Sequence, residues 1–77
     1  MELNNSSINK LICEMIRHQE AKVFEIAREL VPCLTLEDIR NPQDFPELNN
    51  NTTFNYEDGI LTGYLSIKIA LNKLNKA

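Results

Sequence analysis

Two long stretches of the chain repeat apolar residues with the period of an α-helix. In the first, about residues 7–31, apolar side chains recur every three or four positions, which places them on one side of a helix. This stripe contains Ile8, Leu11, Ile12, Met15, Ile16, Val23, Ile26, Ala27 and Leu30. Ser6 or Ser7 is suited to cap the start of the helix. Pro32 ends it, because proline disfavours helical geometry at the residue before it.

The second stretch, about residues 56–75, is apolar on two sides. One stripe consists of Tyr56, Ile60, Tyr64, Ile67, Leu71 and Leu74, and the other of Leu61, Leu65 and Ile69. We expect Asn55 to cap this helix, with Asp58 in the capping-box position three residues later. A helix that is apolar on two sides is either buried or in contact with two partners. We therefore expect a surface other than the first helix to pack against it as well.

The second helix also carries a ridge of small residues, which consists of Gly59, Gly63, Ser66 and Ala70. Glycine inside a helix costs about 1 kcal/mol relative to alanine. Close approach of another helix backbone to the small residues would offset this cost. Alternatively, Gly59 belongs to the helix entrance, and only Gly63 needs an explanation.

The connection between the two helices is long for so small a protein, because compact helical hairpins usually turn within a few residues. Thr35 and Asp38 have the spacing of a capping box, which predicts a short helical turn over about 35–40. An Asn-Pro pair stops this turn, and a loop over about 41–55 follows. Regularly spaced apolar side chains indicate that the connection is ordered and packs back onto the hairpin. These side chains are Leu36, Ile39, Phe45, Leu48, Phe54 and Tyr56.

Together these elements predict one all-α domain, residues 1–77, built as an antiparallel two-helix hairpin with a long ordered loop. A single core in so short a chain supplies only about 3–5 kcal/mol, so such chains usually need a disulfide, a metal or a second subunit. Cys13 and Cys33 form no CxxC pair, and without a signal peptide they indicate reduced thiols of a cytoplasmic protein. One histidine and no Cys/His cluster argue against a structural metal. Self-association is therefore the remaining source of the missing stability. Two hairpins would form a four-helix bundle homodimer.

Candidate residues for the dimer interface lie on both helices. Gln19 is near the centre of the first stripe, where a buried amide must find hydrogen-bond partners. It either fixes the register of a bundle or lies near an end of the contact and reaches water. Phe24 lies on a shoulder of the same stripe, beyond what one partner helix covers. The candidates from the second helix are Leu61, Gly63, Leu65 and Ile69.

The net charge of −3 is concentrated in the connection, where residues 32–59 carry six acids and only one cation, Arg40. The acids either form a solvated acidic loop or dock a basic partner. Loop aromatics framed by acids would present an acidic-aromatic epitope to another protein, unless the aromatics belong to the core. The candidate partner-binding residues are Asp44, Phe45, Glu47, Phe54 and Glu57.

The chain has no Gly-rich phosphate loop, G-x-S-x-G, H-E-x-x-H or EF-hand pattern, which argues against an enzyme and against a resident cofactor. No apolar run approaches the length of a membrane span. The leading hypothesis is therefore a small cytosolic, non-enzymatic interaction protein, such as an adaptor, a chaperone-like protein or a regulatory subunit.

Two alternative functions stay open. In the first, Glu14 and His18 join loop acids across the dimer in a metal-binding or catalytic bundle, although a helix pair with this spacing is typically a surface pair. In the second, a homodimer binds nucleic acid through Lys10, Arg17 and Arg28, which the acidic net charge disfavours.

Overall fold

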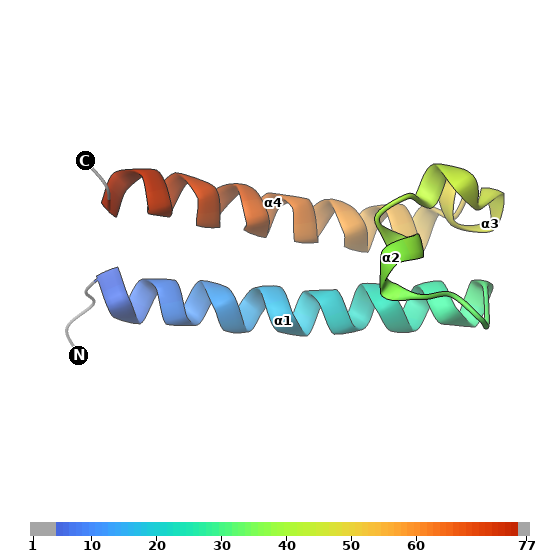
Figure 1. Ribbon diagram of the computed structural model, residues 1–77, viewed down its shortest axis with the longest axis horizontal. Helices are drawn as coiled ribbons and strands as arrows, with labels where there is room; N and C mark the ends of the chain where they lie inside the picture. Colours follow the sequence, from blue (N-terminus) through green and yellow to red (C-terminus); the bar gives the residue numbers. More distant parts are fainter. Residues whose placement is uncertain (1–4, 76–77) are drawn as a thin grey trace.

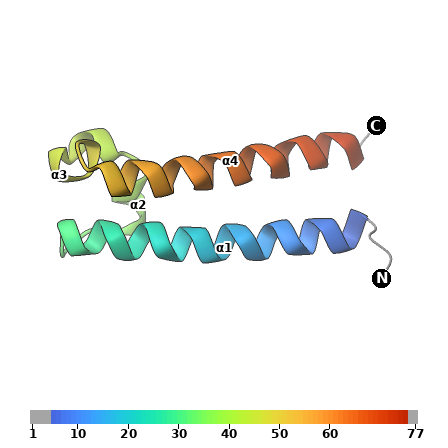
Figure 2. The ribbon, with the colours of Figure 1, turned by 180° about the vertical axis from the view of Figure 1, so that it is seen from behind.

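The computed structural model describes residues 5–75. This part of the chain consists of helices joined by short irregular segments, and it contains no strand. The elements are α1 (Asn5–Leu30), α2 (Leu36–Ile39), the 3-10 helix η1 (Pro42–Asp44), α3 (Pro46–Asn49) and α4 (Thr52–Asn75). Helices α1 and α4 run antiparallel side by side, and the short helices gather at the end where the chain turns (Figures 1 and 2). The prediction of an all-α hairpin is confirmed.

The hairpin is elongated, with extents of 43 × 24 × 20 Å. Its Cα radius of gyration is 14.8 Å, whereas a compact domain of this length has about 11.5 Å. The cause is simple: two helices of 26 and 24 residues lie in a single layer, and each is about 36–39 Å long.

Helix α4 begins at Thr52, four residues before the predicted start. The Oδ1 of Asn51 accepts a hydrogen bond of 2.8 Å from the backbone N of Phe54, so Asn51 is the capping side chain. Asn55, the cap expected from the sequence, lies inside the helix and donates from its side chain to the backbone O of Asn49 at 2.9 Å. The earlier start places Phe54 on the inner side of α4, where it is fully buried.

The predicted turn over 35–40 is present as α2, and its capping box is complete. Thr35 Oγ1 accepts from the backbone N of Asp38 at 3.2 Å, and an Asp38 carboxylate oxygen accepts from the backbone N of Thr35 at 3.0 Å. The predicted loop over 41–55 is mostly helical, because it contains η1, α3 and the first turn of α4. Four of the six apolar side chains expected to pack do so: Leu48 and Phe54 are completely buried, and Ile39 and Phe45 are partly buried against the core. The expectation is wrong for Leu36 and Tyr56, which are 66% and 68% exposed.

The hydrophobic core lies at the turn end of the hairpin, where α1, the short helices and α4 meet. Its buried members are Val23, Ala27, Leu34, Leu48 and Phe54. The partly buried residues packed against them are Ile26, Leu30, Val31, Ile39, Phe45 and Leu61. Away from this core the two long helices contact mainly each other, so their outer sides remain open.

The contact between α1 and α4 runs between the two apolar stripes of α4 rather than along one of them. Glu57 is buried on this line, and Lys68 is half-buried on it. Each stripe is therefore only partly covered: Ile67 of the first stripe is 48% exposed, and Leu65 of the second is 41% exposed. The polar positions Glu57 and Lys68, which lie between the two stripes, therefore face α1.

The ridge of small residues on α4 faces outward. All four of its members are exposed, and a Cβ atom added at Gly59 or Gly63 would meet no atom within 4 Å. Close approach of another backbone to this ridge, which we expected from the sequence, does not occur within the hairpin.

None of the helices in the described residues is long and apolar enough to cross a membrane.

Candidate functional site

A polar cluster joins the two long helices at the middle of the hairpin. Gln19 on α1 is buried, and its Nε2 donates to the backbone O of Glu57 at 2.7 Å and to Glu57 Oε1 at 2.9 Å. The Nζ of Lys22 lies 3.2 Å from the other carboxylate oxygen of Glu57. The hydrogen bond from Gln19, assisted by Lys22, holds the pKa of Glu57 below its ordinary value against the opposing effect of burial.

This cluster corrects two expectations from the sequence. Gln19 does not reach water near an end of the contact, since it retains only 8% exposure and finds its partners on α4. Glu57 is not a free acid of the loop, because it is buried on α4 and paired with Gln19 and Lys22. The cluster links residues 38 positions apart in the sequence, so local patterns could not reveal it.

The other candidate partner-binding residues do not assemble into the expected epitope. Phe54 lies in the core with no exposed surface, as the alternative interpretation required, because α4 begins early enough to include it. Phe45 is half-buried and packs against the same core. Asp44 and Glu47 are exposed at the turn end. The acidic part of the predicted surface therefore remains accessible, whereas its aromatic part is mostly inside.

The candidate interface residues lie on different sides of the hairpin. Phe24 is half-buried, with the guanidinium carbon of Arg28 5.5 Å from its ring centroid. Leu61 packs against the core. The remaining candidates on α4 are exposed, and these are Gly63, Leu65 and Ile69.

An apolar groove of about 250 Å³ opens on the side of the hairpin that carries α2. We call it the α2 groove. Its apolar lining consists of Val23 from α1, Leu36 and Ile39 from α2, and Leu61 and Leu65 from α4. Val23 is buried at its base, whereas Leu36 is 66% exposed at its edge.

Charged residues also line the α2 groove, and they were not among the candidates from the sequence. They are Glu20 on α1, Arg40 after α2, and Asp58 on α4. Burial raises the pKa of Asp58. A sequence signal for part of this lining did exist, because Asp58, Leu61 and Leu65 have the i, i+3, i+7 spacing of one helix face.

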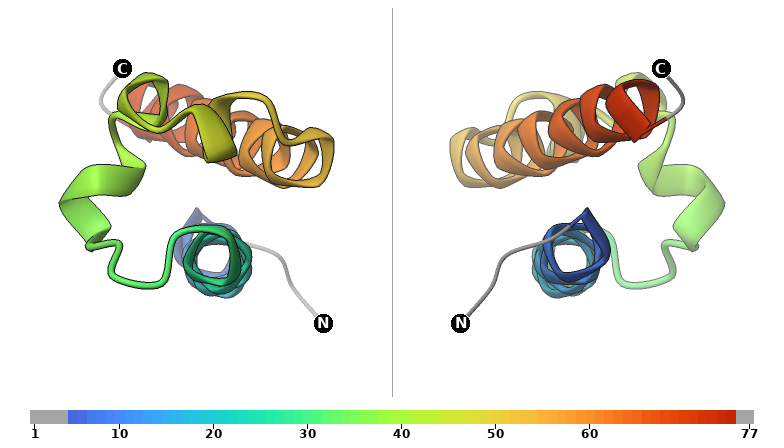
Figure 3. Two further views of the ribbon diagram at one scale, coloured as in Figure 1. Left: turned by 90° about the vertical axis from the view of Figure 1, so that its right-hand side faces the viewer. Right: turned by 90° about the vertical axis from the view of Figure 1, so that its left-hand side faces the viewer.

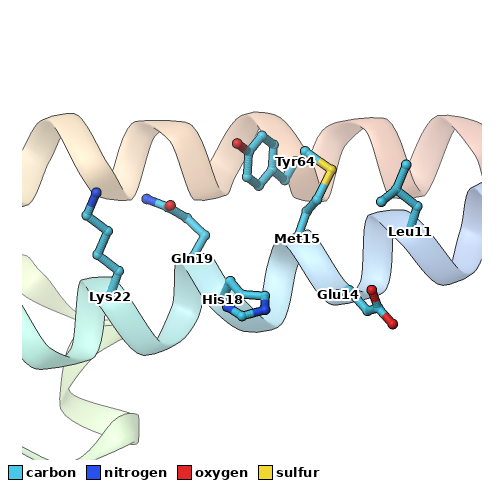
Figure 4. A pocket seen from close by; sticks show the side chains of 7 residues that line it. All are labelled: Leu11, Glu14, Met15, His18, Gln19, Lys22 and Tyr64. Carbon is cyan, nitrogen blue, oxygen red and sulfur yellow. The ribbon is translucent and has the colours of Figure 1, made fainter.

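The opposite side of the hairpin holds a mixed polar and apolar surface, which we call the Tyr64 face. It is lined by Leu11, Glu14, Met15, His18, Gln19, Lys22 and Tyr64. Tyr64 and Met15 lie between the helices there, whereas Glu14 and His18 point away from α4 (Figure 4). Asp44 in η1 and Glu47 in α3 lie at the turn end, so the chain does not bring them to Glu14 and His18. Among residues 5–75, no three side chains of His, Cys, Asp or Glu are grouped so that they could hold a metal ion.

Large apolar side chains are exposed along both long helices. Those at least 41% exposed are Leu11, Leu36, Tyr56, Leu65, Ile67, Ile69 and Leu74. The accessible surface is 5790 Å², compared with about 4800 Å² for a compact protein of this mass. The excess is close to the ~800 Å² that each partner contributes to an interface of standard size.

No family model, curated protein or solved structure matches this chain.

Proposed function

We propose that this chain is a small non-enzymatic protein that acts through protein–protein interaction, and that its working form is a homodimeric four-helix bundle. The observation that carries the proposal is the exposed apolar surface on both edges of α4, where Leu65 and Ile67 lie in opposite stripes. Leu65 and Ile69, four positions apart in one stripe, are both exposed, and an exposed apolar surface on one helix face is typical of an association site.

The elongated single layer of α1 and α4 supports this form. Two such hairpins, packed face to face, supply the four antiparallel helices of a bundle and cover one open side of each layer. The small size of the core supports it as well, because only six apolar residues are buried within the described residues. A second subunit is a common source of the missing stability in so short a chain.

The turn end supports a role for the dimer as an adaptor, a chaperone-like protein or a regulatory subunit. Asp44 and Glu47 are exposed there, away from the open faces of the long helices. They would stay accessible in a bundle and offer an acidic surface to a basic partner. The proposal includes a cytosolic location, since Cys13 and Cys33 are free thiols.

Molar mass measured over a concentration series tests the self-association. We expect twice the 8.9 kDa of the chain, with dissociation on dilution. A mass of one chain at about 1 mM would limit any association to roughly −4 kcal/mol or weaker and would overturn the proposed dimer.

Partner binding by the acidic end is tested separately. A tagged wild-type protein and a D44K/E47K variant are used to capture partners, with E14K/E25K as the control of equal charge change on the outer side of α1. Capture that is lost only in D44K/E47K supports the acidic surface. Equal capture by all three proteins contradicts it.

A further inference from the structure

We infer that the second copy of the chain docks in the α2 groove, with Arg40 of each protomer against Asp58 of the other. This inference rests on the proposed self-association and adds the face, the residues and the symmetry of the contact. Two open faces compete for this role, and the α2 groove is favoured by its apolar lining, its shape and its charges.

The Tyr64 face is the weaker candidate because of its chemistry. Glu14, His18 and Lys22 border it, and the ammonium of Lys22 is already paired with Glu57 within the same chain, so it is not available to a second copy. The α2 groove offers a more apolar lining, since the buried Val23 and the partly buried Leu61 lie at its base. Ile69 continues the same stripe of α4 beyond Leu65 and is 57% exposed.

The shape of this side is self-complementary. α2 stands to one side of the α1–α4 pair when the molecule is viewed along its long axis (Figure 3). Leu36 on α2 projects with 66% exposure beside the groove that its own helix helps to form. A twofold axis through the groove would place Leu36 of each protomer in the apolar lining of the other, as an isologous contact requires.

The charges at the groove point to the same occupant. The carboxylate of Asp58 is partly desolvated, and within residues 5–75 it has neither a hydrogen-bond donor nor a cation as partner, so burial alone shifts its pKa. Arg40 has only a loose contact with Glu37, at 3.6 Å, in which both side chains are more than three-quarters exposed. Such a pair contributes about 0–1 kcal/mol at most and leaves the guanidinium available.

A second copy satisfies both groups at once. The twofold relation brings Arg40 of one protomer to the Asp58 and Glu20 edge of the other, and it does so twice in each dimer. The planar guanidinium suits a carboxylate better than any other cationic side chain does. The groove is thus complementary to itself. It carries the unpaired Asp58 and the free Arg40, and the projecting Leu36 matches its apolar hollow.

Reciprocal charge substitution tests this contact. We expect R40E and D58R each to raise the dimer dissociation constant by about tenfold or more, because like charges then face each other twice per dimer. The R40E/D58R double variant restores the pair in reverse and should return to within about threefold of the wild-type value. K73E and D44R are the matched controls, since both are exposed residues outside the groove, and they should leave dissociation nearly unchanged.

Replacing one apolar residue by aspartate in each stripe of α4 provides a matched pair of variants. Leu65 lines the α2 groove and is 41% exposed, whereas Ile67 lies in the opposite stripe and is 48% exposed. L65D should abolish the dimer while I67D preserves it. Far-UV circular dichroism of each variant verifies that the helices remain folded.

The outcomes separate this inference from the proposed function. If the wild-type chain is a monomer, self-association and its α2-groove form both fail. If it is a dimer that resists R40E and L65D but is broken by I67D, the dimer stands and the inference is overturned in favour of the opposite stripe of α4, which carries Ile67. If it is a dimer that none of these substitutions weakens, neither groove charges nor groove apolar residues hold it, and the inference is overturned as well.

Discussion

The side-chain amide of Gln19 on α1 bonds Glu57 on α4 twice, through the backbone O at 2.7 Å and the carboxylate at 2.9 Å. These bonds tie a buried polar residue of one helix to a buried acid of the other. They also fix the rotation of α4, because Glu57 can face α1 only if the two apolar stripes turn to either side. This rotation leaves both stripes only partly covered by α1.

We expect Q19L to destabilise the hairpin, because it leaves the buried carboxylate of Glu57 without its principal hydrogen-bond donor. The melting temperature should fall by roughly 5 °C or more, whereas R17A, on the exposed side of α1, should change it little. The Q19L/E57L double variant should recover much of the loss, because no buried polar group is then left unpaired. Circular dichroism melts of the four proteins provide the measurement.

The lowered pKa of Glu57 predicts how its contribution depends on pH. A folded-state pKa below the ordinary 4.5 means that the ionised group stabilises the fold above that value. This stabilisation is lost as the pH falls through the lower folded-state pKa. The stability difference between wild type and E57Q, measured by urea unfolding, should therefore be largest at neutral pH and shrink below pH 4.5. A difference that is constant from pH 7 to pH 3, or an equal effect of E47Q at the exposed Glu47, would contradict this.

The observed start of α4 predicts unequal effects of two neighbouring asparagines. N51A removes the capping acceptor of Phe54 N and should lower the free energy of unfolding by about 1 kcal/mol. N55A removes only an exposed side-chain contact to Asn49 and should change it by about 0.5 kcal/mol or less. Urea unfolding of both variants distinguishes the two positions, and a larger loss for N55A would favour the later helix start that the sequence suggested.

The outward-facing ridge predicts that alanine is tolerated at Gly63. A Cβ there has open space, so G63A should raise the free energy of unfolding by about 1 kcal/mol through helix propensity alone. Thermal unfolding at low protein concentration, where the protein is monomeric, measures this gain in stability. A rise in the dimer dissociation constant in the same variant would instead mean that a second backbone approaches the ridge in the dimer.

Several features followed from the sequence because they depend on neighbouring residues. The periodic apolar positions predicted α1 and α4, Pro32 predicted the end of α1 to within one or two residues, and the spacing of Thr35 and Asp38 predicted the capped turn of α2. The sequence also indicated that the long connection is packed, and Leu48 is fully buried in it.

Other features were decided only by tertiary contacts. Both Asn51 and Asn55 are good caps by local chemistry, and burial of Phe54 in the core selected the first of them. The two stripes of α4 were visible in the sequence, but the direction in which they point was not. That direction depends on Gln19 and Glu57, which lie 38 positions apart and meet only when the hairpin closes. Local propensities determined which segments are helices, whereas long-range packing and one buried polar contact determined which sides of those helices face water.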